Sequence, residues 1–190
     1  MAHRKLLPEL RYHIQRISER TGRLREPVHA YLAGGMAVNF HTGSRMSRNV
    51  EIKWSHRLAV PPDLQVFEVL NPIDPDDIQI VSMDGEIGDH LGSFHPDWKQ
   101  DSEEVAHFGD LVLHVISAID LAVSKIGRFS ERDREDITDL ASHGLISSKQ
   151  LEIRGAEAID HYIGDNRFMQ LTLGDAIEIV KKFEHDDCQP

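Results

Sequence analysis

The 190-residue sequence has a single cysteine, Cys188, and lacks any apolar run as long as a membrane span. One cysteine excludes an internal disulfide framework and any zinc site built from several cysteines, and it fits a reducing compartment. A membrane helix needs roughly 18 apolar residues, and a secretory leader needs an apolar segment behind its basic start. The sequence shows neither, so we expect a cytoplasmic protein with no membrane partner.

Several catalytic motifs are also missing. The sequence contains no Gly-x-Ser-x-Gly nucleophile elbow and no glycine loop that ends in a lysine, so neither an α/β-hydrolase nor a P-loop ATPase is expected. Histidines are plentiful, with 12 in the chain. Four of them could be considered as zinc ligands: His90, His95, His107 and His114. Their spacing matches none of the usual zinc patterns, so we expect them to be scattered, solvated side chains.

The net charge is −11, but it is divided unevenly along the chain. Residues 1–60 hold 11 Lys and Arg against 4 Asp and Glu, whereas residues 61–190 hold 10 against 28. The acidic whole argues against indiscriminate binding of nucleic acid. The basic residues of the first third either bind a phosphate-bearing ligand or cover solvent-exposed helix faces. Composition alone does not distinguish these two interpretations.

The first third of the chain alternates helical and strand patterns. Apolar residues recur at helical spacing over residues 4–20, which predicts an amphipathic helix. Residues 28–33 predict a short buried strand, and residues 36–40 predict a helix. Polar and apolar residues alternate over 49–54. This alternation predicts a half-buried strand with three polar residues on one face, namely Asn49, Glu51 and Lys53.

Residues 58–110 are rich in proline, aspartate and glycine, which predicts short strands and turns. Strands are expected at 64–70 and 78–83, with a turn at Asp84-Gly85. Residues 111–116 predict a further strand because they are almost all apolar. We therefore expect the middle of the chain to be mostly sheet and loops.

Four helices are expected after residue 116, because a Ser or Thr followed three residues later by Asp or Gln precedes each helical pattern. The four pairs are Ser117 with Asp120, Ser130 with Asp133, Ser147 with Gln150, and Thr172 with Asp175. The third helix is expected to bury Leu151, Ile159, Tyr162 and Ile163.

The predicted fold class is α/β (α+β), with a mixed sheet followed by a helical C-terminal third. We expect residues 1–115 to form the α/β core. Residues 116–190 are expected to form a helical region that packs on this core, so that the chain is a single compact unit.

The glycine pair Gly34-Gly35 lies between a predicted strand and a predicted helix, and it precedes the strand that carries Asn49 and Glu51. Glycine allows the backbone to approach a ligand closely, and a helix N-terminus offers N–H groups to phosphates. Residues 49 and 51 point to the same side of a strand. Two oxygen ligands beside a phosphate-binding turn suit magnesium, which takes one or two carboxylates together with substrate phosphates.

These two segments, Leu32-Ala33-Gly34-Gly35 and Asn49-Val50-Glu51-Ile52, resemble the signature of the nucleotidyltransferase superfamily with the polymerase-beta-like core. A second element runs from Ser117 to Lys125, then Arg128, then Arg132 to Ile137. It is similar to a motif in AbiEii-like nucleotidyltransferase toxins of toxin–antitoxin or abortive-infection systems, which include toxins that add nucleotides to tRNA. The resemblance covers residues 28–57 and 111–146.

The resemblance implies a nucleoside triphosphate substrate and a Mg²⁺ or Mn²⁺ ion. It implies that Asn49 and Glu51 hold the metal, and that Asp133 or Asp136 is needed for activity and orients Lys125 or the acceptor. The residues expected to contact the triphosphate are Gly34, Gly35, Ser44, Arg45, Lys125 and Arg128. The acceptor would be an RNA, with tRNA favoured, or a protein hydroxyl, and a cognate antitoxin is a further expected partner. A basic stretch would meet the acceptor's phosphates: Arg45, Arg48, Lys53, His56 and Arg57.

Position 49 departs from the family pattern, which has Asp where this chain has Asn49. An amide oxygen is a weak magnesium ligand beside a carboxylate and does not offset the charge of the ion. Three interpretations follow: an engineered inactive form, a natural non-catalytic member that binds a nucleotide or a partner, or an enzyme with weaker metal binding. The strand at 111–116 offers no further acid, because His114 is its only polar side chain.

Simpler interpretations of the same residues remain. Lys125 and Asp133 would then form an ordinary ion pair between helices, and Asp136 would lie on an exposed helix face. Asn49 and Glu51 would be solvent-facing residues of an edge strand. The nucleotidyltransferase hypothesis instead requires Asn49, Glu51 and Lys125 to converge on one pocket. The alternative function is a catalytically dead protein of the same fold that acts as a binding module.

Overall fold

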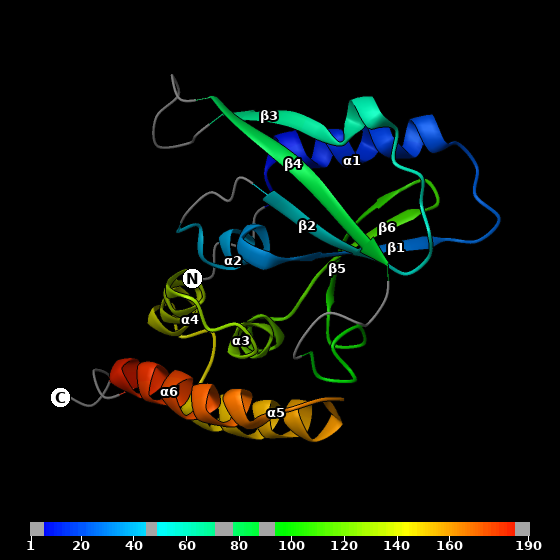
Figure 1. Cartoon of the computed structure of the whole chain (residues 1–190). Coiled ribbons are helices and arrows are strands. Elements are labelled where there is room, and N and C mark those ends of the chain that lie inside the picture. The colour runs from blue at the N-terminus through cyan, green and yellow to red at the C-terminus, as the bar shows by residue number, and fades with distance from the viewer. Residues whose placement is uncertain (1–5, 45–48, 71–77, 88–93, 185–190) are drawn as a thin grey trace. The chain divides into compact units, whose positions relative to one another are not determined.

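The computed structural model describes residues 6–44, 49–70, 78–87 and 94–184 (Figure 1). The backbone divides into two compact units. The sheet unit comprises Arg4–Gly88 and Ser102–Ile116, and the helical unit comprises Met1–His3, Asp89–Asp101 and Ser117–Pro190.

The sheet unit contains a six-stranded mixed sheet with the strand order β3-β4-β2-β1-β6-β5. Its strands are β1 (Val28–Ala33), β2 (Asn49–Trp54), β3 (Val66–Leu70), β4 (Ile78–Ile87), β5 (Glu103–Phe108) and β6 (Leu111–Val115). The central strand β1 is antiparallel to β2 and parallel to β6, and β2 is parallel to β4. The two outer pairs, β3 with β4 and β5 with β6, are antiparallel. The sheet confirms the predicted mixed α/β class.

Two helices and a short 3-10 turn, η1 (Pro62–Leu64), accompany the sheet. The amphipathic helix α1 (Pro8–Thr21) packs its apolar face against β3, β5 and η1. This face is made of Leu10, His13, Ile14 and Ile17. Helix α2 (Gly34–Thr42) directly follows β1, packs on β1 and β2, and is buried over almost its whole length. Its Met36-Ala37-Val38 run and Phe40 fit this burial, and the polar residues Asn39, His41 and Thr42 are buried with them.

The predicted strands at 28–33 and 49–54 are confirmed with the same bounds. The predicted turn at Asp84-Gly85 is wrong, because β4 continues through both residues to Ile87. The continuation follows from pairing: β4 lies in parallel register with the whole of β2, from Asn49↔Ser82 to Trp54↔Ile87. A long-range ladder therefore overrides a local turn signal.

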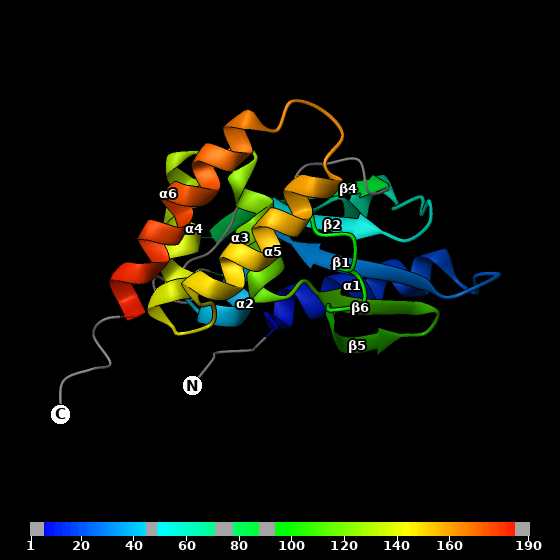
Figure 2. The same cartoon turned by 90° about the horizontal axis from the view of Figure 1, so that it is seen from below.

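The helical unit is built from α3 (Ala118–Ile126), α4 (Glu131–Ser142), α5 (Ser148–His161) and α6 (Arg167–Glu184), which Figure 2 shows from below. Three of the predicted helix starts are confirmed. Ser117 accepts the N–H of Asp120, and complete capping boxes open α4 and α5. These side chains satisfy N–H groups that the first turn of a helix leaves unpaired.

The predicted start of the last helix at Thr172 is wrong, because α6 begins at Arg167. Thr172 lies inside α6, where its buried hydroxyl donates to the Ile126 carbonyl of α3 at 2.7 Å. The predicted burial of Tyr162 and Ile163 is also wrong, since they follow the end of α5 and are 37% and 96% exposed. None of the helices in the described ranges is long and apolar enough to cross a bilayer.

Candidate functional site

The junction between β1 and α2 places a glycine directly against a carboxylate. Ala33, the last residue of β1, is the register partner of Glu51 on β2. The next residue, Gly34, has a φ of +59°, and a Cβ at that position would lie 2.8 Å from Glu51 Oε2 and 3.3 Å from Glu51 Cβ. Both the left-handed backbone and the lack of space therefore require glycine. Gly34 is what allows the Glu51 carboxylate to lie at the start of α2.

The N-terminus of α2 has no side-chain cap. The residue before the helix, Ala33, has no side-chain oxygen to accept an N–H, and the first turn of α2 carries no acidic residue. The first N–H groups of a helix have no partner within the helix, and the helix dipole adds partial positive charge at this end. The backbone of Gly34 and Gly35 therefore offers donors beside Glu51, as phosphate binding needs.

Glu51 is paired with a buried lysine on its own strand. Glu51 Oε1 lies 3.2 Å from Lys53 Nζ, and the two residues are two apart on β2. The Lys53 side chain is 4% exposed, whereas the Glu51 side chain is 43% exposed. Glu51 therefore has one oxygen toward the lysine, one toward Gly34, and a face open to solvent.

Asn49 lies at the start of β2 and is exposed. Its Oδ1 accepts a hydrogen bond from the Ser82 hydroxyl of β4 at 3.1 Å. The interpretation of Asn49 and Glu51 as residues of an edge strand is wrong, because β2 lies between β1 and β4. An internal strand positions both side chains more firmly than an edge strand would.

Glu51 and Asn49 are the oxygen-bearing side chains that β2 offers here as possible metal ligands. Within the described residues, no group of three His, Cys, Asp or Glu side chains is placed to hold a metal ion. One carboxylate, Glu51, and one amide oxygen, Asn49, fit magnesium only in combination with substrate phosphates. The Gly34 junction beside Glu51 is where such phosphates would lie. The residues therefore fit a metal that enters together with a triphosphate.

Sequence reasoning missed that Asp84 is a backbone register partner of Glu51. The parallel register of β2 and β4 pairs Glu51 with Asp84. The predicted strand at 111–116 carries no acid, and the local signal at Asp84-Gly85 predicts a turn. Apolar Val81 and Met83 alternate with polar Ser82 and Asp84, and this short alternation was the available signal for a longer strand.

A row of rings continues across the sheet from Lys53. The register pairs Lys53 with Tyr31 on β1 and Tyr31 with His114 on β6. The rings of Tyr31 and His114 stack with centroids 4.8 Å apart, and His29 Nδ1 lies 2.8 Å from His114 Nε2. Burial and the nearby charge of His29 lower the pKa of His114. His114 thus belongs to a ring stack on β1 and β6.

The other histidines that were considered as zinc ligands do not share a neighbour in the described part of the chain. His107 Nε2 lies 2.8 Å from Glu104 Oε1 on β5. His95 Nε2 lies 3.1 Å from Glu157 Oε2 in the helical unit. His90 lies outside the described residues.

The helical unit gathers the second set of predicted residues. Lys125 Nζ lies 2.9 Å from Asp136 Oδ2 and 3.7 Å from Asp133 Oδ1. All three residues are buried, with 7% of Lys125 and 1% of each aspartate exposed. The interpretation of Asp136 as an exposed surface residue is therefore wrong. The ion pair between Lys125 and Asp133 is present, and Asp136 is the nearer partner.

Asp133 is held from several sides. Arg128 donates to both of its oxygens at 2.8 and 2.7 Å, and the N–H and hydroxyl of Ser130 donate to Oδ2 at 2.9 and 2.7 Å. Burial alone would raise the pKa of Asp133, but the hydrogen bonds from Arg128 and Ser130 and the charge of Lys125 lower it to about 2. Asp133 is therefore a fixed anion that orients Arg128 and Lys125.

The helical unit also contains a buried ion pair that the sequence did not suggest. Asp120 is fully buried, and Arg154 of α5 donates to its two oxygens at 2.8 and 3.0 Å. Arg154 also donates to Asp101 at 2.5 Å. The sequence assigned Asp120 only to the start of α3, and nothing in the local pattern pointed to Arg154. These contacts connect α3, α5 and the segment before β5.

Two predicted ligand residues are not brought to the glycine turn. Ser44 follows the end of α2, where its hydroxyl lies 2.8 Å from that of Thr42. A helix of nine residues is about 13 Å long, so Ser44 lies at the far end from Gly34. Arg45 lies outside the described residues. Lys125 belongs to the helical unit and Glu51 to the sheet unit, so their convergence stays a prediction.

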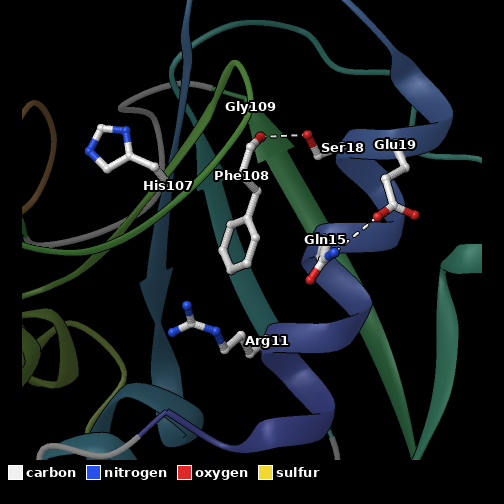
Figure 3. Close-up of a pocket in the computed structure, with 7 residues that line it drawn as sticks. All are labelled: Arg11, Gln15, Ser18, Glu19, His107, Phe108 and Gly109. Carbon is white, nitrogen blue, oxygen red and sulfur yellow. Dashed lines mark hydrogen bonds between the residues drawn. The ribbon is translucent and has the colours of Figure 1, made fainter.

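A surface hollow of about 430 Å³ lies elsewhere on the sheet unit (Figure 3). Helix α1 and the turn between β5 and β6 form it, and the Arg11 guanidinium lies 5.6 Å from the centre of the Phe108 ring. Figure 3 shows His107 pointing away from α1. The hollow contains none of the predicted site residues, and it is lined by Arg11, Gln15, Ser18, Glu19, His107, Phe108 and Gly109.

Comparison with known proteins agrees with this geometry at the level of the family. A search of curated proteins finds no match to the chain. The model of the family described as nucleotidyltransferase of unknown function (DUF6036) matches residues 12–182. The match includes the Gly34 junction, Glu51, Lys125 and Asp133, and it spans most of the chain. The chain therefore belongs to this nucleotidyltransferase family.

Proposed function

We propose that the protein transfers a nucleotide from a nucleoside triphosphate to an acceptor hydroxyl. The observation that carries this proposal is the Glu51 carboxylate lying against Gly34 at the uncapped N-terminus of α2. Backbone N–H groups that can bind phosphate and a carboxylate that can bind a metal ion thereby lie side by side. In-line nucleotidyl transfer needs both. The oxygen of the acceptor hydroxyl attacks the α-phosphorus and its proton passes to solvent, while pyrophosphate leaves with the electron pair of the broken phosphoanhydride bond.

Each residue has a defined task in this proposal. The N–H groups of Gly34 and Gly35 bind phosphate oxygens, and Glu51 with the Asn49 oxygen would hold the metal. A bound Mg²⁺ or Mn²⁺ ion would supply positive charge that offsets the charge of the triphosphate. Lys125 offsets charge on the leaving pyrophosphate. Asp133 and Asp136 hold the Lys125 ammonium in place.

The acceptor and the biological role are the finer parts of the proposal. We propose an RNA acceptor, with tRNA favoured over a protein hydroxyl, a toxin role controlled by a cognate antitoxin, and a cytoplasmic location. The resemblance of residues 111–146 to AbiEii-like toxins supports these assignments. The basic first third of the chain supports an acceptor that carries phosphates.

A second candidate function is a binding protein without catalysis, and Asn49 favours it. The family pattern has an acid at this position, and an amide there leaves Glu51 as the only described carboxylate at the junction. Such a protein would retain nucleotide binding through α2 and would transfer nothing.

Label transfer from α-³²P nucleoside triphosphates to total RNA separates the two functions. The variants are Asn49→Asp, Glu51→Gln and, as a matched control, Glu68→Gln, which removes an exposed carboxylate from β3. The proposal expects magnesium-dependent labelling by the native chain or by Asn49→Asp, loss on Glu51→Gln, and no change on Glu68→Gln. Nucleotide binding without labelling in every form would favour the binding protein. Neither binding nor labelling would refute both.

A further inference from the structure

We propose that His29 and His114 form a pH-sensitive clasp between β1 and β6, which joins the two strands while both imidazoles are neutral and opens when they take up protons. The clasp is the contact between His29 Nδ1 and His114 Nε2, which lie 2.8 Å apart. Strand β1 ends at Ala33, directly before Gly34, so the clasp holds the strand that leads into the candidate site. This inference goes beyond the proposed function and does not depend on it.

The contact between the two rings has room for one hydrogen atom. Each neutral imidazole carries one N–H and one bare nitrogen, so one ring donates and the other accepts. A first added proton leaves this hydrogen bond in place only if both outer nitrogens, His29 Nε2 and His114 Nδ1, then carry hydrogen. A second added proton puts an N–H on both nitrogens of the contact, and the hydrogen bond is lost.

The surroundings of His114 Nδ1 oppose even the first proton. Among the described residues, this nitrogen is buried and has no hydrogen-bond partner. A charged ring whose buried N–H has no acceptor costs more free energy than a neutral ring at the same place. Burial and the nearby charge of His29 accordingly lower the pKa of His114. The neutral pair is therefore the favoured form in the folded chain.

The groups that face His114 from the neighbouring strands compensate little of this cost. The strands on either side of β6 are β1 and β5. From β1, the uncharged Tyr31 ring stacks on His114 with centroids 4.8 Å apart. From β5, Glu104 is the register partner of His114, but Glu104 Oε1 lies 2.8 Å from His107 Nε2. In the described part of this cluster, one carboxylate thus faces three imidazoles, and acid gives the cluster an excess of positive charge.

The clasp is closed at neutral pH and opens in mild acid. A histidine with a lowered pKa in the folded chain contributes its full stability above the unfolded value of 6.5, and this contribution is lost as the pH falls. Histidine is also the side chain whose ordinary charge change lies in this range. The pairing of β1 with β6 should therefore weaken below pH 6.5.

A double-mutant cycle at two pH values tests the clasp. The four forms are the native chain, His29→Phe, His114→Phe and the double variant, and urea unfolding at pH 8 and pH 5 gives their folding equilibrium constants. Phenylalanine keeps a ring for stacking and removes the titrating nitrogens. His13 is present in all four forms, so its own titration cancels. The control is a matched cycle of His29→Phe with His161→Phe, which replaces an exposed histidine of α5.

At pH 8, the native pair is expected to raise the folding equilibrium constant about tenfold above the value that additive single substitutions predict. This coupling should vanish or reverse at pH 5, and the control cycle should show none at either pH. Equal coupling at both pH values, or no coupling at pH 8, would overturn the inference.

The ¹⁵N resonances of the imidazoles in the native chain provide a second measurement if the phenylalanine variants do not fold. His114 Nδ1 should be a bare nitrogen at pH 8 and should gain its proton only below pH 6.5. Proton uptake by this nitrogen at pH 6.5 or above would also overturn the inference.

Discussion

Replacing Asp133 with asparagine keeps the shape of the side chain and removes its charge. In the native chain this carboxylate accepts two hydrogen bonds from Arg128 and two from Ser130, and it closes the capping box of α4. An asparagine would direct an NH₂ group at one of these donors. Lys125 would also keep only one of its two anionic partners, Asp136.

The pKa of Asp133 sets the size of the effect. The pKa falls from 3.8 to about 2 on folding, which corresponds to about 2.5 kcal/mol of stability at neutral pH. The Arg128 side chain is 71% exposed, so solvent weakens its interaction with Asp133. We therefore expect about 2 kcal/mol of stabilisation from the Asp133 charge. In a chain of this length, Asp133→Asn should lower the melting temperature by about 4–8 °C.

The dependence on pH identifies the charge as the cause. A carboxylate with a depressed pKa stabilises the folded state fully above its unfolded value of 3.8, and this contribution is lost as the pH falls toward 2. Urea midpoints of the native chain and Asp133→Asn should therefore differ by a constant amount between pH 7 and 5. The difference should narrow below pH 4. Glu135→Gln, an exposed change on the same helix, is the control and should stay within about 0.5 kcal/mol.

Equal midpoints of Asp133→Asn and the native chain at pH 7 would refute the assignment of Asp133 as a fixed anion. A difference that persists unchanged down to pH 3 would show that side-chain geometry, rather than charge, carries the stability.

Three further predictions concern other parts of the molecule. Gly34→Ala should lower the free energy of unfolding by about 1–2 kcal/mol because alanine disfavours the left-handed backbone at this position. The added methyl group should also displace Glu51, so nucleotide titration should show weaker binding. Unaltered binding would contradict the described junction. Burial lowers the pKa of His13 below 6.5, so its contribution to stability is complete above that pH and is lost at lower pH. Urea midpoints between pH 7.5 and 5 should fall less in His13→Gln than in the native chain, and parallel curves would argue against this role. Arg154→Met should destabilise the chain by about 3–5 kcal/mol in thermal melts, because Asp120 is left buried without its main partner, and a loss below 1 kcal/mol would contradict this.

Local patterns in the sequence were enough to predict one half of the candidate site. The strands at 28–33 and 49–54 follow from a short apolar run and from alternation of polar and apolar residues, respectively. The glycine at the strand–helix junction, Gly34, follows from the conformational freedom of glycine. Each of these signals acts within a few residues, so the sequence carries it directly. The capping boxes of α4 and α5 were predictable for the same reason.

The contacts that depend on pairing between distant segments could not be predicted. No local pattern indicates that residues 82–87 lie beside residues 49–54, so the sequence around Asp84 predicts a turn where the structure has a strand. The pairing of Lys53 with Glu51 was open to prediction from their spacing, but the burial of the lysine depends on the neighbouring strands. Thr172 resembled a helix cap, and only its contact with Ile126 shows that it is an internal residue.

The position of β6 beside β1 has a consequence for how the chain folds. The first paired residues of these strands, Val28 and Leu111, are separated by most of the sheet unit and by part of the helical unit. The central strand therefore stays half-paired during synthesis until the last strand has left the ribosome, and closing so long a loop is slow. An N-terminal fragment that stops before β6 would expose the unpaired edge of β1 and would be prone to aggregate. Truncations intended to isolate the sheet unit must consequently extend through Ile116.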